Sequence, residues 1–262
     1  MNNSPEKHPT VLVADDNQEI LDLLADDLSE NYEVIKVTNG QEAIDYLQEN
    51  MVDLIVSDVM MPYVDGYELC ARLKESVSHC HIPFILLTAK INLQYKIEGL
   101  NHGADAYIEK PFSPTYLQAQ ISSLLRNRHH VREHYSKSPE TPLQSMAFNK
   151  ADQVFLQKLN SLIMDNLSEQ GLCVDMLADS MHMSRPTLYR KIKAISNLSP
   201  NELINITRLK RATELLIDRE FKIYEISALV GFNSSSHFTR NFQKQFGISP
   251  KEYADSIENK TL

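Results

Sequence analysis

Short apolar runs alternate with segments of helical spacing through the first half of the chain, and this alternation limits the fold more than any other feature. The run Thr10–Ala14 (TVLVA) is typical of a buried strand, and Gln18–Leu28 then places apolar residues at helical intervals. Strands that alternate with helices favour a parallel sheet covered by helices on both faces. We therefore expect a doubly wound α/β domain. The expected strands are residues 10–14, 32–37, 54–57, 83–87 and 106–108, and the expected helices are residues 18–28, 41–48 and 114–125.

An internal repeat organises the second half of the chain, where helical spacing runs almost throughout. Two copies of one helical unit, offset by 50 residues, explain the pattern, and two copies are too few for a solenoid. A long amphipathic helix, expected at Asn201–Ile217, separates the copies. The matching positions are Ala178 with Ala228, Ser184 with Ser234, Leu188 with Phe238, Arg190 with Arg240, Ile192 with Phe242, and Ser199-Pro200 with Ser249-Pro250.

The length of 262 residues suits two ordinary domains. Residues 127–150 show little apolar periodicity and contain two prolines and several polar residues, which is typical of a linker. The start of this segment can continue the preceding helix. We therefore expect a first domain at residues 1–126, a linker at 127–150, and an all-α second domain at 151–262.

Charge is distributed unevenly between the two halves. The whole chain carries a net charge of −9, which by itself argues against a nucleic-acid partner. Residues 1–149 hold 11 lysines and arginines against 22 acidic residues, whereas residues 150–262 hold 15 against 13. Because local basic surfaces contact phosphates, the second half remains compatible with binding to nucleic acid.

Two further classes of protein are disfavoured. The longest apolar run, near residues 82–87, is too short to span a bilayer, and the first ten residues are polar, so we expect a cytoplasmic protein without membrane contact. Three cysteines, none in a CxxC pair, indicate reduced structural thiols. The segment His79-Cys80-His81 suggests a metal site only superficially, because adjacent residues rarely point at one ion and no further ligand is evident.

Acidic residues gather where the predicted strands end. Asp15 and Asp16 follow the first strand, and Asp58 follows the third. Ligands of open parallel sheets bind at the carboxyl ends of the strands, and clustered carboxylates favour Mg²⁺. Thr88 and Lys110, at the ends of the next two strands, add a hydroxyl and a cation. Together these groups can accept and hold a phosphoryl group. The alternative, that such acids are only helix N-caps, explains one of them more easily than all.

This half of the chain resembles the receiver family. The matching motifs are VADDN (13–17), SDVMMPYVDG (57–66), LLTA (86–89) and GADAYIEKPF (103–112). The resemblance implies a flavodoxin-like fold in which Asp58 accepts the phosphoryl group. It implies that Asp16, Asp58 and the backbone carbonyl of Met60 bind Mg²⁺, with the assistance of Asp15.

The same resemblance assigns further roles at this edge of the sheet. Thr88 and Lys110 would bind the phosphoryl oxygens, and the Lys110–Pro111 peptide would be cis. Tyr107 falls at the aromatic position through which the family switches, although it can equally serve core packing.

Each copy of the repeat contains a helix with one apolar face and one polar face. The first such helix, Arg185–Ile195, follows a shorter helix at Val174–Met181 and contains four basic residues: Arg185, Arg190, Lys191 and Lys193. A polar, basic helix face held by a preceding helix and turn suits the DNA major groove, although such faces are more often simply solvated. The expected DNA contacts are Arg185, Thr187, Tyr189, Arg190 and Lys193 in the first copy, and Ser235, Ser236, Thr239, Arg240 and Gln243 in the second. The apolar faces are expected to bury Leu188, Ile192 and Ile195, and Phe238, Phe242 and Phe246.

This half resembles the AraC family, whose fold joins two helix-turn-helix units by a linker helix. The matching segments are MSRPTLYRKIKAISNLSPNELI (183–204), RLKRATELL (208–216) and VGFNSSSHFTRNFQKQFGISPKEY (230–253). A receiver followed by this module is most similar to the output ends of hybrid two-component systems from Bacteroidetes. The sugar-binding barrel of sugar-responsive AraC proteins is absent, so the expected input is phosphorylation.

The two resemblances together imply a DNA-binding regulator of transcription that is controlled by phosphorylation and is not a turnover enzyme. The implied partners are a sensor histidine kinase, or a kinase module of the same chain, double-stranded DNA and RNA polymerase. A homodimer is expected on phosphorylation.

Three alternatives stay open. The chain can be the C-terminal output portion of a longer hybrid sensor kinase, or a pure phosphorelay receiver, which the second half disfavours. A phosphohydrolase of the haloacid dehalogenase type also uses an aspartate nucleophile with Mg²⁺. That class requires a second aspartate two residues after the nucleophile, where this chain has Met60.

Overall fold

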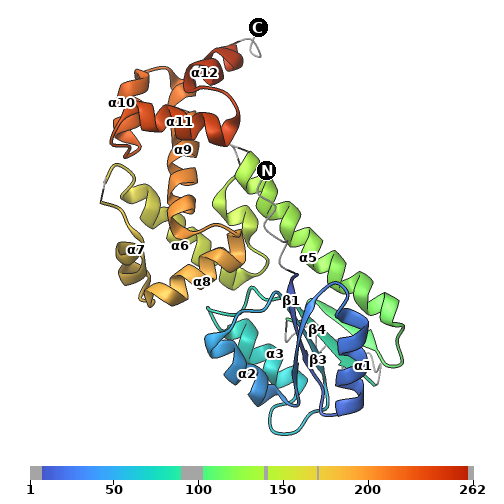
Figure 1. Cartoon of the computed structure of the whole chain (residues 1–262). Coiled ribbons are helices and arrows are strands. Elements are labelled where there is room, and N and C mark those ends of the chain that lie inside the picture. The colour runs from blue at the N-terminus through green and yellow to red at the C-terminus, as the bar shows by residue number, and fades with distance from the viewer. Residues whose placement is uncertain (1–7, 90–102, 139–140, 170, 259–262) are drawn as a thin grey trace. The chain divides into compact units, whose positions relative to one another are not determined.

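The computed structural model describes residues 8–89, 103–138, 141–169 and 171–258 (Figure 1). The chain divides into two compact units between His129 and His130, and each unit is described by itself. Within the described residues, no helix is both long enough and apolar enough to cross a membrane.

The first unit contains a five-stranded parallel sheet in the order β2-β1-β3-β4-β5, which confirms the predicted α/β class. Strand β1 pairs with β2 on one side and with β3 on the other, so the order of strands reverses direction at β1. Such a change of direction opens a crevice at the carboxyl ends of the two central strands. The strands are β1 (Thr10–Ala14), β2 (Glu33–Val37), β3 (Leu54–Asp58), β4 (Phe84–Thr88) and β5 (Ala106–Glu109).

Helices pack on both faces of this sheet and enclose two apolar cores. One core holds residues of α2 (Gly40–Glu49) and α3 (Gly66–Glu75), and the other holds residues of α1 (Gln18–Leu28) and α5 (Pro114–Lys137). Side chains of Asn17, Asn39 and Asp65 cap α1, α2 and α3 by accepting backbone N–H bonds. Apolar spacing did not predict α3, whose short apolar stripe begins directly after the turn-rich segment that follows β3.

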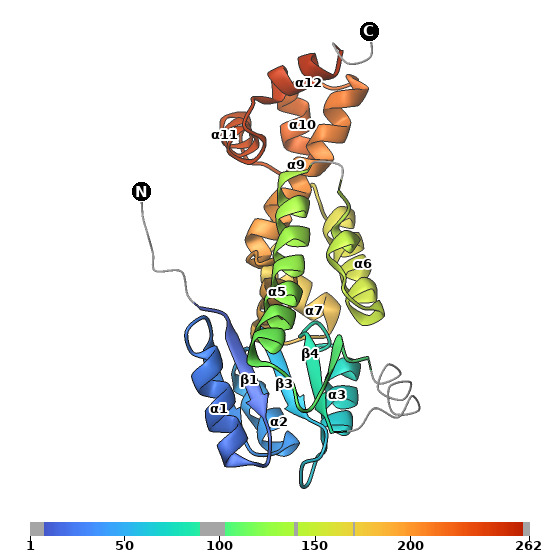
Figure 2. The same ribbon diagram turned by 90° about the vertical axis from the view of Figure 1, so that its right-hand side faces the viewer.

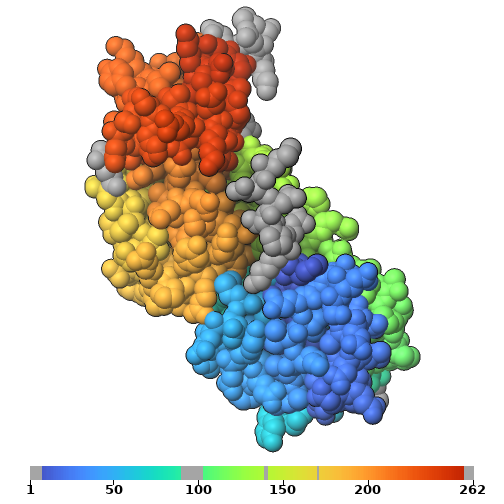
Figure 3. All heavy atoms as spheres, viewed as in Figure 1, coloured from blue at the N-terminus to red at the C-terminus, as the bar shows by residue number. Residues whose placement is uncertain are grey.

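The second unit is all-helical, as the repeat predicts. The serines that match across the repeat accept backbone N–H bonds at helix starts: Ser184 and Ser234 cap the two polar helices, Ser199 caps the long helix between them, and Ser249 accepts from Glu252 at the start of the last described helix. The elements are η1 (Leu143–Met146), α6 (Lys150–Asp165), α7 (Val174–Met181), α8 (Arg185–Ser196), α9 (Pro200–Asp218), α10 (Ile223–Leu229), α11 (Ser235–Phe246) and α12 (Pro250–Glu258). In Figure 3 the visible surface of this unit consists mainly of the orange and red segments from α8 onward.

Aromatic rings form the centre of the second repeat copy. Phe238 and Phe242 are fully buried and lie edge to face, with ring centroids 5.7 Å apart, and Phe242 packs in the same way on Phe246 and Tyr253. Phe246 is only partly buried, whereas the apolar pattern suggested a fully buried position.

Part of the segment expected to be a linker belongs to the core of the second unit. Helix α5 continues to Lys137 (Figure 2). Tyr135, Leu143 and Met146 are buried with the residues of α6 and α9. The surrounding sequence is largely polar, so apolar spacing does not indicate these buried residues. The domain boundaries at residues 126 and 150 stay a prediction.

Candidate functional site

Three charged side chains meet at the carboxyl edge of the sheet. Asp15 follows β1, Asp58 ends β3, and the register between these paired strands aligns Ala14 with Ser57, so the two carboxylates are neighbours. Lys110 follows β5, and its long side chain reaches past β4 to both of them. Its Nζ lies 2.8 Å from Asp15 Oδ2 and 2.6 Å from Asp58 Oδ1. The sequence prediction that these strand ends converge is thus supported by the geometry.

Because the carboxylates are buried, the protonation state of Lys110 depends on its contacts with them. Asp15 and Asp58 are buried, with relative exposures of the whole residues of 1% and 8%. Partial burial by itself lowers the pKa of Lys110, but the hydrogen bonds to Asp15 and Asp58 outweigh burial, and the pKa of Lys110 is raised above its ordinary value. Lys110 therefore stays protonated, and its single positive charge offsets one of the two carboxylate charges.

Backbone groups hold both carboxylates in place. The N–H of Met60 donates to Asp58 Oδ2 at 2.7 Å, and the N–H of Asn17 donates to Asp15 Oδ1 at 3.0 Å. Gly66 lies so close behind Asp58 that an added Cβ would be 2.2 Å from the Asp58 carbonyl oxygen. Only glycine fits there, and this fixes the loop between β3 and α3 against the site.

The other residues predicted for this site lie around the cluster. Asp16 is exposed at its rim, and Thr88 is half-buried at the end of β4, where its carbonyl accepts the N–H of Lys110 at 2.8 Å. The Lys110–Pro111 peptide is cis. Tyr107 lies in β5 with its hydroxyl oxygen buried and without a hydrogen-bond partner among the described residues, and burial raises its pKa strongly. This placement suits both interpretations of Tyr107, because its ring also packs on the apolar core.

The donor chemistry of this edge fits a hard cation in part. Carboxylate oxygens of Asp15 and Asp58 lie together, which is the ligand type that Mg²⁺ prefers. Among the described residues, however, no three acidic, histidine or cysteine side chains converge closely enough to hold a metal ion. Lys110 Nζ instead bonds to one oxygen of each carboxylate, so a cation at these two oxygens would share them with the ammonium.

The polar face of α8 is largely accessible. Arg185, Tyr189 and Lys193 are exposed, while Thr187 and Arg190 are partly exposed. The opposite face buries Leu188, Ile192 and Ile195, as the apolar spacing predicts.

One basic residue of α8 is not part of this face. Lys191 is 1% exposed, its Nζ lies 2.5 Å from Asp152 Oδ1 in α6, and Asp152 is also fully buried. Counting Lys191 among the basic residues of a DNA-facing helix was therefore wrong. Lys191 lies three residues after Leu188 and four before Ile195, on the buried face of α8, where the carboxylate of Asp152 makes burial of its charge tolerable.

The polar residues predicted for α11 share one shallow depression on the surface. Its lining consists of Ser235, Ser236, Thr239, Arg240 and Gln243, the same five residues that the sequence indicates as DNA contacts. Ser235 begins the helix, where free backbone N–H groups favour anions such as phosphate.

Comparison with known proteins agrees with this geometry. Residues 11–122 match the family model of the response regulator receiver domain, and residues 177–256 match that of a helix-turn-helix domain. Histidine kinase P4 of Formosa agariphila is 36% identical over 244 residues, which are 93% of this chain and 18% of that protein.

Two shorter relatives cover the receiver half. Response regulator GtcR of Aneurinibacillus migulanus is 39% identical over 133 residues, or 50% of this chain and 54% of that protein. The signal receiver domain of a histidine kinase from Syntrophus aciditrophicus is 36% identical, covers 45% of this chain and 91% of that structure, and gives a TM-score of 0.44. This chain thus spans about half or less of the curated proteins named here.

The parallel sheet with its lysine-bridged carboxylates defines the first unit as a receiver domain of the response regulator class. This domain is followed by an AraC-type helix-turn-helix domain. The chain therefore combines these two domains, an architecture typical of regulators rather than of turnover enzymes. The expected similarity to a Bacteroidetes histidine kinase is also confirmed.

Proposed function

We propose that this protein regulates transcription in response to phosphorylation of Asp58. The observation that carries the proposal is the contact of Lys110 with Asp15 and Asp58 at the sheet edge, in a chain that also presents two polar helices in a helix-turn-helix domain. A buried carboxylate held beside a fixed cation is suited to attack a phosphorus atom and to stabilise the charged product.

The donor of the phosphoryl group would be the phosphohistidine of a sensor histidine kinase. An Asp58 carboxylate oxygen attacks the phosphorus, an O–P bond forms, and the N–P bond breaks. The electron pair leaves with the imidazole nitrogen, which is protonated from solvent. Lys110 and Thr88 would bind the phosphoryl oxygens at the sheet edge.

Asp15, Asp16, Asp58 and the backbone carbonyl of Met60 would hold Mg²⁺. When bound, Mg²⁺ would neutralise negative charge on the phosphoryl oxygens. In our proposal the side chain of Tyr107 changes its rotamer when Asp58 carries the charged phosphoryl group.

Double-stranded DNA is the proposed target of the second unit. Residues of α8 and α11 would enter successive major grooves on one face of the duplex. The DNA contacts proposed are Arg185, Thr187, Tyr189, Arg190, Lys193, Ser235, Ser236, Thr239, Arg240 and Gln243. Since DNA and RNA polymerase share the bacterial cytoplasm, we place the protein there, with RNA polymerase as a further partner.

Phosphorylation and DNA binding are tested together. The protein is incubated with acetyl phosphate and Mg²⁺, its mass is measured, and its binding to a randomised DNA pool is compared before and after. The native protein should gain one phosphoryl group and bind DNA more tightly, whereas Asp58→Ala should do neither. Asp45→Asn, a change in an exposed carboxylate of α2, serves as the control. Labelling of Asp58→Ala, or labelling in excess chelator, would refute the assignment.

We propose that phosphorylation promotes a homodimer through the receiver face that carries Tyr107 and α5. Sedimentation with and without a phosphoryl mimic tests this step. An unchanged monomer mass in both states at micromolar concentration would contradict it.

A second possibility is that these domains form the output end of a longer hybrid histidine kinase. The match to Histidine kinase P4 favours it, because nearly all of this chain aligns with less than a fifth of that protein. An immunoblot of native cells, probed with antibody against the second unit, distinguishes a product of about 30 kDa from a much larger one.

A further inference from the structure

Helices α8, α9 and α11 of the second unit each form hydrogen bonds with the same short stretch of chain. This stretch, residues 130–138, contains the last residues of α5 and Ser138 directly after it, and is called the α5 tail below. Arg132 in the tail donates to α8, while Gln245 of α11 and Lys210 of α9 donate to carbonyl oxygens of the tail. Both helices proposed to read DNA are thus attached to one rigid segment outside the repeat.

Arg132 caps the C-terminal end of α8. Its Nε lies 2.9 Å from the carbonyl oxygen of Ile195, and a second guanidinium nitrogen donates to the carbonyl of Ala194. The last carbonyls of a helix lack partners within the helix and carry partial negative charge. A guanidinium offers two parallel donors in a fixed geometry, so it fixes the orientation of the helix end as well as its distance.

Gln245 makes the corresponding contact from α11. Its Nε2 donates to the carbonyl oxygen of Ser136 at 2.5 Å. Arg132 and Ser136 are one turn apart on the same helix, so their separation is set by helix geometry. The C-terminal ends of α8 and α11 are therefore both hydrogen-bonded to one helical segment, which fixes the distance between their two attachment points.

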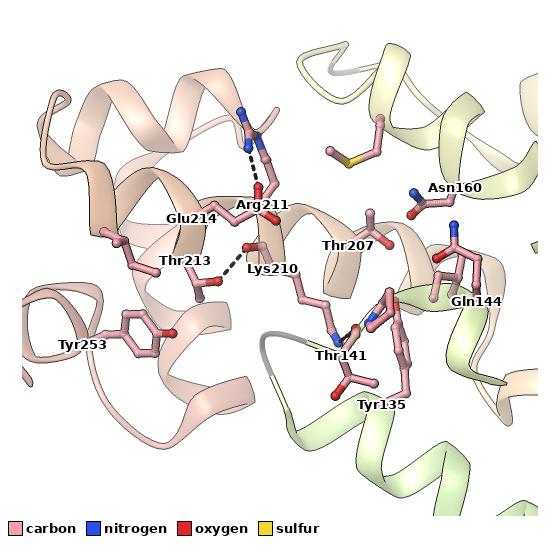
Figure 4. A pocket seen from close by; sticks show the side chains of 14 residues that line it. Tyr135, Thr141, Gln144, Asn160, Thr207, Lys210, Arg211, Thr213, Glu214 and Tyr253 are labelled. Carbon is pink, nitrogen blue, oxygen red and sulfur yellow. Dashed lines mark hydrogen bonds and ion pairs between the residues drawn. The ribbon is translucent and has the colours of Figure 1, made fainter. Parts of the chain in front are cut away.

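Lys210 attaches the linker helix α9 to the end of the tail. Figure 4 shows its side chain reaching toward Thr141 with the ring of Tyr135 beside it. Its Nζ donates to the carbonyl oxygens of Ser138 and Thr141, both at 2.8 Å, and lies 3.8 Å from the centroid of the Tyr135 ring. Tyr135 is itself 1% exposed, so the tail is anchored in the core at this point. A buried ammonium requires such partners, which makes the contact sensitive to small displacements.

We propose that the α5 tail sets the relative placement of α8 and α11, with Arg132, Gln245 and Lys210 as positioning residues. The inference rests on the proposed function, in which these helices read two neighbouring DNA segments. Arg132 and Gln245 determine which spacing between the two segments is accepted, and Lys210 holds the tail in register with α9.

Spin labels on α8 and α11 measure this placement without DNA. The exposed residues Lys193 and Lys244 are changed to cysteine in a Cys173→Ser background, where the remaining thiols of Cys70 and Cys80 are buried. Distances between the labels are measured by pulsed electron paramagnetic resonance. The test variants are Arg132→Gln, Gln245→Ala and Lys210→Met, and the control is Lys137→Gln, whose exposed lysine pairs with Glu133 of the same helix.

The three test variants should broaden the distance distribution, while the control leaves it unchanged. The same chains without labels are used to select from a randomised DNA pool. The native protein and the control should select paired elements at one spacing, whereas Arg132→Gln and Gln245→Ala should accept several spacings and bind the native spacing about tenfold less tightly. Arg132→Lys keeps a cationic donor at the end of α8 and should restore part of the preference.

A narrow, native-like distance distribution in both Arg132→Gln and Gln245→Ala would overturn the inference. A broadened distribution that leaves the spacing preference unchanged would also overturn it. If the native protein selects no DNA at all, the proposed function fails, and the distance measurement still decides whether the α5 tail positions the two helices. Circular dichroism of each variant separates loss of positioning from loss of folding.

Discussion

Lys110 Nζ lies 2.6 Å from Asp58 Oδ1, although Asp58 ends β3 and Lys110 follows β5, and β4 separates these two strands in the sheet. The lysine therefore acts as an internal counter-ion for the carboxylate proposed to be phosphorylated. Because it also contacts Asp15, it competes with any cation that approaches the same oxygens.

Removal of this counter-ion should strengthen binding of divalent cations. In Lys110→Met, the carboxylates of Asp15 and Asp58 lose their ammonium partner, and Mg²⁺ should bind roughly three- to tenfold more tightly because it no longer shares them. Titration calorimetry with Mg²⁺ measures the effect. Lys36→Met, which removes an exposed partner of Asp22, should leave the affinity unchanged. Weaker binding by Lys110→Met would show that the lysine organises the site rather than competes for it.

Breaking the buried pair between α6 and α8 should destabilise the second unit strongly. Asp152→Asn leaves the ammonium of Lys191 buried without its counter-charge, at a cost of about 3–5 kcal/mol in the free energy of unfolding. Native-state amide hydrogen exchange in α6 and α8 reports the loss. Lys137→Met, which breaks an exposed pair, should change the exchange by less than about 0.5 kcal/mol. If Asp152→Asn behaves like this control, the pair is not a stabilising contact.

Most of the first unit could be predicted from local pattern because its strands are buried and its helices amphipathic. The structure places β1 at Thr10–Ala14 and α1 at Gln18–Leu28, where the apolar pattern placed them. Helix α3 escaped prediction because it follows the loop that carries the site motifs, where apolar periodicity is short. The repeat likewise predicted α8 and α11, whose caps are the matched Ser184 and Ser234.

Contacts between distant residues were not predictable in this way. The basic residue Lys191 looks like part of a polar helix face until Asp152, 39 positions away, is placed beside it. Arg132 lies in a polar segment whose role depends on the end of α8, and its sequence neighbours give no sign of this. Motif spacing identified the strand-end cluster. It did not indicate that Lys110 contacts one oxygen of each carboxylate, because this contact depends on how the strand ends are arranged in space.

The two polar helices should affect DNA recognition differently. Arg190→Ala should relax base preference within one groove segment, because an arginine can bind a guanine edge with two hydrogen bonds worth about 1–3 kcal/mol of discrimination. Ser235→Ala should weaken binding more evenly across sequences, since a hydroxyl at the start of α11 is placed for phosphate contact.

Selection from a randomised DNA pool at fixed salt separates these two outcomes. Ser256→Ala, a change at an exposed hydroxyl of α12, is the control for Ser235→Ala. An intact selected motif for Arg190→Ala, together with loss of part of the motif for Ser235→Ala, would contradict the assignment.

Lys210 should make the stability of the second unit depend on pH above neutrality. Burial lowers the pKa of Lys210 from 10.5 to about 8. Between these two pH values the unfolded chain keeps a proton that the folded chain has released, so the free energy of unfolding contributed by this residue rises with pH. The size of the shift sets an upper limit of about 3.4 kcal/mol on this rise, and solvent screening reduces it. The neutral amine still has two hydrogens for its two carbonyl partners.

Urea unfolding at a series of pH values tests this dependence. The free energy of unfolding of the native protein, minus that of Lys210→Met, gives the contribution of this lysine. This difference should increase from pH 8 to 10.5. Lys137→Met supplies the comparison for an exposed lysine on α5. A difference that is flat or falls with pH would show that the ammonium is not the costly form in the folded state.

The buried pair of Lys191 and Asp152 also limits how this DNA-reading module can be moved between proteins. The stretch that matches the helix-turn-helix family model begins at residue 177, after α6 has ended. A graft cut at that border would carry Lys191 into its new host without the carboxylate that allows its burial. The transferable cassette must therefore start ahead of Asp152. Helix α8 therefore depends on α6 for its folding, and any exchange of output domains has to include α6.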